Sequence, residues 1–233
     1  MFAVKLGALY VEMGKINEGM ELLNQGLSQM IGNQLNQSNN QVHKDKIRLR
    51  GFQNSQSRKV GNSLSQDIKE TNYDILYELH YQLGIAHTHF KNFNQAISHY
   101  QAAVKLPIYP LLKLGGYNNL GNLLKASADF IGAKNAYETA IKIDPSFVTG
   151  YYNLGMVCKA MGSLVEAIDC YDKAIQLNPD YAEAYQNLGV VLLKVGDVET
   201  SLAAFEYAIA LHEQNNPQEA QRLRQGLQDM GLK

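Results

Sequence analysis

The segment YYNLG, residues 151–155, decides the fold of this 233-residue chain because it recurs along the sequence. The related segments YNNLG and YQNLG occupy residues 117–121 and 185–189, each 34 residues away. Asn153 precedes the Leu-Gly pair although asparagine is about 0.7 kcal/mol less favourable than alanine in a helix interior. The recurrence predicts an internal repeat and raises the question of what the amide does.

The repeat carries further fixed positions on the C-terminal side of each Leu-Gly pair. A small residue follows the glycine by 12 positions, an aromatic residue comes four later and an alanine three after that. The four copies are Gly84, Ala96, Tyr100 and Ala103; Gly121, Ala133, Tyr137 and Ala140; Gly155, Ala167, Tyr171 and Ala174; and Gly189, Ser201, Phe205 and Ala208. This signature resembles the tetratricopeptide repeat (TPR), a unit of two antiparallel helices.

Within the unit at 148–181, apolar residues recur at helical spacing in two stretches, which predicts one helix over about 149–161 and a second over 164–177. Gly162 is expected to end the first helix. Ser163 is expected to cap the second, with Glu166 completing a capping box.

Small residues of the repeat are expected where two helix backbones approach closely. Gly155 and Ala167 occupy these positions, and Tyr151 and Tyr171 supply bulk around them. One hairpin cannot bury its apolar faces alone, so the units must stack. The resemblance implies an all-α fold, a right-handed TPR superhelix of antiparallel hairpins.

The sequence divides into four regions on this basis. We expect a divergent TPR-like hairpin over 1–30, in which glycine twice replaces alanine, then an insertion over 31–66, repeat units over 67–215 and a C-terminal capping helix over 216–233. The four repeat units are expected at about 77–113, 114–147, 148–181 and 182–215. Pro107 and Pro110 should end the second helix of the first of these units, where three extra residues lie.

The insertion is rich in Asn, Gln and Ser, without a sustained apolar period, and is expected to be disordered. Residues 43–59 are basic. They fit either a mobile arm for an acidic partner or a solvated loop. The basic residues are Lys44, Lys46, Arg48, Arg50, Arg58 and Lys59.

The two ends of the array differ. The apolar stripe of the expected capping helix consists of Ala220, Leu223, Leu227 and Met230. At the other end, the outer face formed by Phe2, Leu6 and Tyr10 is left uncovered. We expect this face to meet a partner or a second copy, or to continue a longer array.

Catalytic and cofactor motifs are missing from the sequence. It contains no phosphate-binding loop, dinucleotide fingerprint, zinc-protease motif or nucleophile elbow, so we expect no enzyme, no cofactor and no metal. Histidines cluster at His80, His87, His89 and His99. Metal binding needs converging ligands, and we expect packing or surface histidines instead.

Composition limits the compartment and the partners. A net charge of −1 gives no case for a nucleic-acid partner. There is no transmembrane segment, since no run of 18 apolar residues occurs. Cys158 and Cys170 fit buried thiols in a reducing, cytoplasmic environment.

The TPR resemblance implies that the first helix of each unit lines an inner groove, and that the residue before Leu-Gly faces into it. An amide there can bond both the N–H and the C=O of an extended peptide. The expected groove residues are Gln82, Asn118, Asn119, Asn122, Lys125, Tyr152, Asn153, Met156, Lys159, Gln186, Asn187, Val190 and Lys194. A second interpretation remains open, in which the amides tie neighbouring helices together or have no role.

The asparagine row is similar to that of O-linked N-acetylglucosamine transferases, where it holds extended protein substrates. Chaperone-binding relatives use a Lys/Arg/Asn clamp instead, and Glu183 and Asn187 depart from it. We therefore expect a protein–protein interaction scaffold or adaptor that holds an extended peptide. The alternatives are the substrate-recruiting arm of a glycosyl- or methyltransferase without its catalytic domain, and a purely structural spacer.

Overall fold

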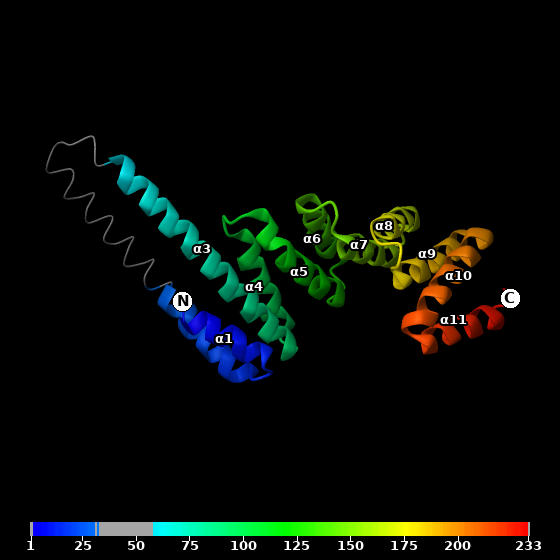
Figure 1. The fold of residues 1–233 in the computed structure, drawn as a ribbon, viewed down its shortest axis with the longest axis horizontal. Helices are drawn as coiled ribbons and strands as arrows, with labels where there is room; N and C mark the ends of the chain where they lie inside the picture. The colour runs from blue at the N-terminus through cyan, green and yellow to red at the C-terminus, as the bar shows by residue number, and fades with distance from the viewer. Residues whose placement is uncertain (1, 31, 33–57, 233) are drawn as a thin grey trace. The chain divides into compact units, whose positions relative to one another are not determined.

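The computed structural model describes residues 2–30, 32 and 58–232, and within them it is built of helices without a β-strand (Figure 1). The chain forms two compact units, residues 1–116 and 117–233. The all-α fold class predicted from the repeat is confirmed. None of the helices in the described ranges is both long and apolar enough to cross a membrane.

The first unit begins with a helical hairpin, formed by α1 (Phe2–Glu12) and the helical residues 16–30. It packs against the C-terminal half of the long helix α3 (Arg58–His89), as Figure 1 shows. The shared core contains Val4, Val11, Leu23, Leu79, Leu83 and Ala86. Gly7 and Gly19 lie where the hairpin helices touch, since a Cβ on Gly7 would lie 3.0 Å from the Gly19 carbonyl oxygen. Glycine therefore replaces the alanine of the repeat where the backbones meet most closely.

The insertion predicted over 31–66 is shorter than expected at its C-terminal end. Residues 31 and 33–57, with most of the basic stretch 43–59, lie outside the described residues. Residues 58–66 are helical and form the first turns of α3. The sequence of α3 contains no proline, the one residue whose cost of about 3 kcal/mol reliably interrupts a helix, so polar composition alone did not end it.

The predicted break after the first regular hairpin is confirmed. Helix α4 (Phe93–Lys105) ends just before Pro107, and Pro110 begins the short 3-10 helix η1 (Pro110–Lys113). Proline lacks the N–H that would continue the helical hydrogen bonds. The three extra residues are thus accommodated in this connection.

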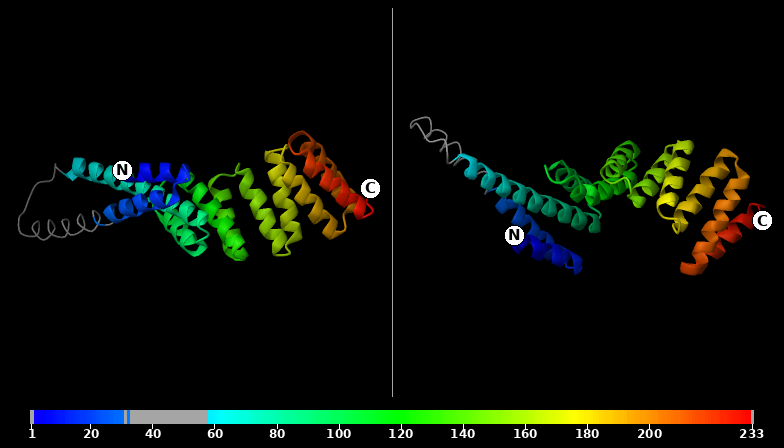
Figure 2. Two further views of the ribbon diagram at one scale, coloured as in Figure 1. Left: turned by 90° about the horizontal axis from the view of Figure 1, so that it is seen from below. Right: turned by 45° about the horizontal axis from the view of Figure 1, so that its top comes forward.

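The second unit is a succession of antiparallel helices, each packed on the next (Figure 2). Helix α5 (Leu114–Ala126) leads into it from the first unit. The others are α6 (Phe130–Ile143), α7 (Val148–Ala160), α8 (Leu164–Leu177), α9 (Ala182–Val195), α10 (Val198–Asn215) and α11 (Pro217–Asp229). Helices α7 and α8 match the predicted pair to within a residue, and Gly162 ends the turn between them at φ +80°.

The aromatic residue of each repeat packs on the glycine of the Leu-Gly pair, as Tyr100, Tyr137, Tyr171 or Phe205. The Tyr171 ring is fully buried, and a Cβ on Gly155 would lie 2.7 Å from its Cε1 atom. The same 2.7 Å approach joins Gly121 to Tyr137. The Tyr137 hydroxyl donates to Oδ1 of Asn122 at 2.7 Å, whereas the buried Tyr171 hydroxyl has no partner among the described residues. The ring, rather than its hydroxyl, is therefore what the repeat requires at this position.

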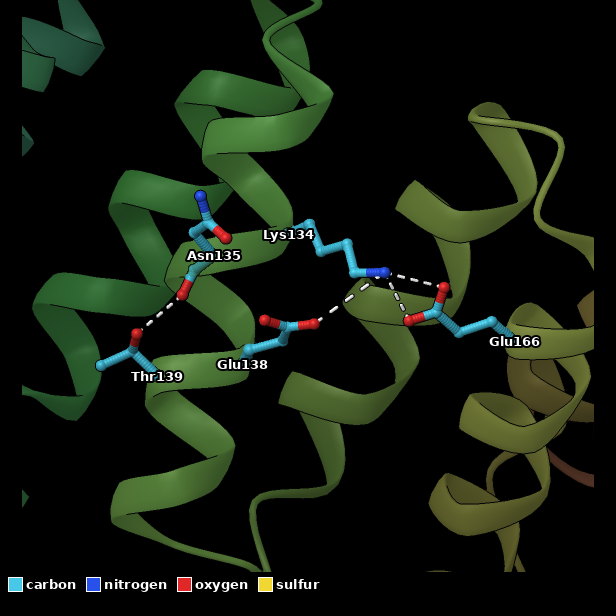
Figure 3. Close-up of polar contacts among 5 residues, drawn as sticks. All are labelled: Lys134, Asn135, Glu138, Thr139 and Glu166. Carbon is cyan, nitrogen blue, oxygen red and sulfur yellow. Dashed lines mark hydrogen bonds and ion pairs between the residues drawn. The ribbon is translucent and has the colours of Figure 1, made fainter.

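The capping box predicted at Ser163 is wrong, because its side chain makes no capping bond. Glu166 instead accepts from Nζ of Lys134 on α6, at 2.5 and 2.7 Å, and Lys134 also pairs with Glu138 at 3.9 Å (Figure 3). A lysine on a neighbouring helix competes for the carboxylate that the box would have used. The capping bond does form where the equivalent residue is an aspartate, as at Asp129.

Helix α11 covers the end of the second unit. Its residues Ala220 and Leu227 are buried with Phe205 and Ile209 of α10, and Leu223 packs at the edge. Met230, predicted in the same stripe, is 53% exposed. The helix ends at Asp229, so Met230 no longer keeps the helical register of the stripe.

Candidate functional site

Ten of the thirteen residues predicted to line the groove share one face of α5, α7 or α9 by their helical spacing. Side chains at i, i+4 and i+7 share a face of a helix. We call this face of the three helices the inner-helix surface. It comprises Asn118, Asn122 and Lys125 on α5, Tyr152, Met156 and Lys159 on α7, and Gln186, Asn187, Val190 and Lys194 on α9.

Direct hydrogen bonds join these helices. The Asn153 amide donates to Oδ1 of Asn118 on α5, with Nδ2···Oδ1 3.2 Å. The Asn187 amide donates to the hydroxyl of Tyr152 on α7, also at 3.2 Å. Both bonds span 35 residues, one repeat plus one position. The residue before Leu-Gly in one unit thus bonds the residue two before Leu-Gly in the preceding unit.

Burial restricts Asn153, and further hydrogen bonds occupy the Asn187 amide. Asn153 is only 7% exposed. Asn187 also donates to the Glu183 carbonyl oxygen at 2.9 Å and accepts a hydrogen bond from Nζ of Lys159. Of the two interpretations left open by the sequence, the tie between neighbouring helices is the one seen for Asn153 and Asn187.

Other predicted residues keep hydrogen-bonding capacity. Asn118 and Asn122 are half-buried and use their Oδ1 atoms as acceptors for Asn153 and Tyr137, which leaves both amide N–H₂ groups without a partner among the described side chains. Asn119, on the same helix, is half-buried. The structure therefore places the available donors of α5 beside the asparagine that the sequence singled out.

Two predicted glutamines differ in their surroundings. Gln186 donates to Oε1 of Glu219 at 3.3 Å, so α11 takes the place that the first helix of a further unit would occupy. Gln82 is buried in the first unit, where it donates to Glu78 at 2.9 Å. Gln82 therefore belongs to the packing of the first unit.

One neighbour of the surface was missed from sequence. The Tyr181 ring lies 4.8 Å from that of Tyr152, centroid to centroid, and precedes α9. An aromatic residue also occurs 34 positions earlier, at Phe147, and this periodicity was the signal that could have identified it. The Tyr181 ring therefore packs against the Tyr152 ring at the start of α9.

The lysines of the surface differ in burial. Lys125 and Lys159 are half-buried and Lys194 is exposed. Burial lowers the pKa of Lys125, and burial together with the charge of Lys194 lowers the pKa of Lys159. The Lys125 ammonium approaches Sδ of Met156 at 3.9 Å. The C-terminal ends of these helices thus carry positive charge that is partly shielded from water.

The histidines of the first unit pack together. Nδ1 atoms of His80 and His99 lie 3.0 Å apart, and the His87 and His99 rings stack with centroids 5.2 Å apart. Nowhere in the described ranges does a group of three or more His, Cys, Asp or Glu side chains have the arrangement to hold a metal ion. Burial, followed by the neighbouring His80 and His87, lowers the pKa of His99 from 6.5 to about 4.

This cluster makes stability depend on pH. A lowered pKa means that the unfolded chain takes up a proton more readily than the folded chain. The stabilisation is therefore complete above pH 6.5 and is lost as pH falls towards 4. We expect the urea midpoint to fall between pH 7 and 4.5, and to fall less in His99→Gln. The exposed His89 supplies the control, and equal pH dependence in His99→Gln and His89→Gln would contradict the assignment.

The two cysteines are free and buried in the second unit. A hydrogen bond with Cys158 and burial raise the pKa of the Cys170 thiol. A protonated, buried thiol is a poor nucleophile. The same hydrogen bond lowers the pKa of Cys158. Both side chains lie in the hydrophobic core of the second unit.

Comparisons with known proteins agree with the repeat. A family model described as "TPR repeat" matches residues 121–162 and 155–196, and one described as "Tetratricopeptide repeat" matches 77–107 and 182–215. These matches together cover more than half of the chain. No curated protein sequence matches it at a significant level.

Solved structures share the fold. A crystal structure of MamA protein aligns with a TM-score of 0.63 at 19% identity, covering 94% of each chain. MamA 41-end from Desulfovibrio magneticus RS-1 aligns with a TM-score of 0.55 at 21% identity, covering 70% of this chain and 98% of that one. At these identities the likeness concerns the fold. Repeats of this kind are typically non-catalytic, and the transferase-arm alternative is not favoured.

The family matches, the helix hairpins and the tyrosine–glycine contacts lead to the same conclusion. The chain belongs to the tetratricopeptide repeat family and is a scaffold for protein–protein interaction.

Proposed function

We propose that the chain is a non-catalytic adaptor that holds an extended segment of a partner protein on the inner-helix surface. The observation that carries this proposal is the direct bonding of α5, α7 and α9 through Asn118–Asn153 and Tyr152–Asn187. These bonds align the same face of the first helix in three successive repeat units. A ligand running across them would meet one similar set of polar groups per repeat.

The amide ties and the peptide surface are compatible. Asn153 and Asn187 fix the spacing of the helices, and ligand contact then falls to their neighbours. The N–H₂ groups of Asn118 and Asn122, which have no partner among the described side chains, can donate to main-chain carbonyls, which an extended peptide offers whatever its sequence. Met156 and Val190 supply half-buried apolar contact beside them.

The cellular setting belongs to the same proposal. Two neighbouring thiols that remain free favour a reducing, cytoplasmic location. Interaction through the N-terminal face stays a prediction. Leu6 and Tyr10 of that face are half-buried.

The test is to select 12-residue binders from a random peptide library and to map them on the full chain by NMR. We expect the largest amide shift changes in α5, α7 and α9, because the ligand contacts these helices. The selected peptides should bind Asn118→Ala/Asn122→Ala about thirtyfold more weakly, as expected when two hydrogen bonds of about 1 kcal/mol each are lost.

The matched control is the exposed Asn135→Ala on α6, which should bind like the wild type. Shift changes confined to α6, α8 and α10, or equal affinity in the double variant and the wild type, would contradict the proposal.

A further inference from the structure

The inner-helix surface carries a lysine in the last turn of each of its three helices, at Lys125, Lys159 and Lys194. Lys125 and Lys159 both follow the glycine of the Leu-Gly pair by four positions, and Lys194 follows Gly189 by five. Met156 lies between the first two, in contact with the Lys125 ammonium. The three charges therefore form a row that crosses the helices.

No carboxylate in the described part of the chain pairs with this row. The ion pairs of the second unit lie elsewhere, at Lys134 and on α11. Lys159 donates to the neutral Oδ1 of Asn187, and Lys125 faces a thioether sulfur. Glu183, on α9, lies beside Tyr152 and Tyr181 rather than beside a lysine. The fold thus shields positive charge without neutralising it.

The helix dipole does not account for this arrangement. A lysine in the last turn favours the C-terminus of any helix. Lys142 has that position on α6 and points into water. Lys125 and Lys159 are half-buried, although burial disfavours an ammonium and lowers the pKa of both. Shielding two charges from water is useful where an anion is to bind, because attraction strengthens as the dielectric falls.

We infer that the segment held on the inner-helix surface is an acidic protein segment whose carboxylates meet this lysine row. The inference rests on the proposed function and adds the chemistry of the partner. Packed helices lie about 8–10 Å apart, and an extended chain advances about 3.3–3.6 Å per residue. One carboxylate about every third residue would therefore match one lysine per helix.

The inference is tested with labelled 12-residue peptides and the full chain, by fluorescence anisotropy. The probe repeats Asp-Ser-Ser, a second peptide has the same composition with its aspartates adjacent, and a third replaces every aspartate by asparagine. We expect the spaced acidic peptide to bind about tenfold more tightly than the other two at low salt, and to weaken as ionic strength rises.

Variants assign the effect to the row. Lys125→Gln/Lys159→Gln should lose about tenfold in affinity for the spaced peptide, and Lys125→Arg/Lys159→Arg should retain it. Glutamine at 159 can still donate to Oδ1 of Asn187, which preserves the hydrogen bond between α7 and α9. The control is Lys142→Gln/Lys173→Gln, which removes the same charge from exposed positions on α6 and α8. It should bind like the wild type.

The outcomes separate the two proposals. If the asparagine peptide binds as well as the acidic one and maps to α5, α7 and α9, the inference is wrong and the proposed function stands. If no peptide maps to these helices, both are wrong. If Lys125→Gln/Lys159→Gln and the control Lys142→Gln/Lys173→Gln lose the same affinity for the spaced peptide, net charge explains the effect and the inference is overturned. Tighter binding of a single-stranded RNA of matched length would overturn it as well.

Discussion

The Leu227→Ala variant is expected to unfold with about 2–5 kcal/mol less free energy than the wild type. Leu227 is 1% exposed and packs with Phe205, Ile209 and Ala220. Truncation leaves a cavity between α10 and α11, which pack against each other. The loss is measured as the change in the urea unfolding free energy of the full chain.

Met230→Ala is the control for this substitution. Its side chain is 53% exposed, and a surface substitution changes stability by about 0.5 kcal/mol or less. Equal losses at the two positions would show that α11 contributes through its helix rather than through a buried face. A loss below about 1 kcal/mol at Leu227 would contradict the capping role.

Gly155→Ala is expected to destabilise the fold by about 1–3 kcal/mol, as for an overpacked core. The new Cβ would lie 2.7 Å from Cε1 of Tyr171, and that ring is fully buried and has no room to move aside. The loss appears despite a helix propensity that favours alanine over glycine by about 1 kcal/mol. The steric contact should therefore decide the sign.

Gly226→Ala separates the steric contact from the helix propensity. Gly226 lies inside α11, and a Cβ there would have no neighbour within 4 Å. Alanine should then stabilise the chain by up to about 1 kcal/mol through propensity alone. Thermal unfolding of the two variants should shift in opposite directions. Stabilisation by both would show that Tyr171 relaxes and that the glycine is not required by packing.

Local features of the helices could be predicted from the sequence where one residue acts on its own backbone or recurs at a fixed spacing. Gly162 ends α7, Pro107 follows the end of α4, and the glycine–tyrosine contacts recur with the repeat. Two local predictions failed, for different reasons. Glu166 left the predicted box for Lys134 on another helix, and Met230 lost the register of its stripe at the end of α11.

The sequence singled out the residues of the candidate site more readily than it predicted what each side chain bonds. Helical spacing predicts that Asn118, Tyr152 and Asn187 lie on one side of their helices, and the hydrogen bonds between these helices involve all three. Whether an amide faces a ligand or a neighbouring helix depends on how far apart the helices stand, and that distance is set by the core beneath them. Asn153 and Asn187 therefore proved to be ties between helices.

The sequence by itself determined the repeat, its helices and the aromatic residue that packs on each Leu-Gly pair, because these follow from periodicity and side-chain size. Only the tertiary structure decided what the asparagine of YYNLG bonds and that Lys125 and Lys159 are half-buried without a carboxylate partner among the described residues. These hydrogen bonds join residues 28 to 35 positions apart on different helices, and no local sequence pattern specifies such partners or their shielding from water.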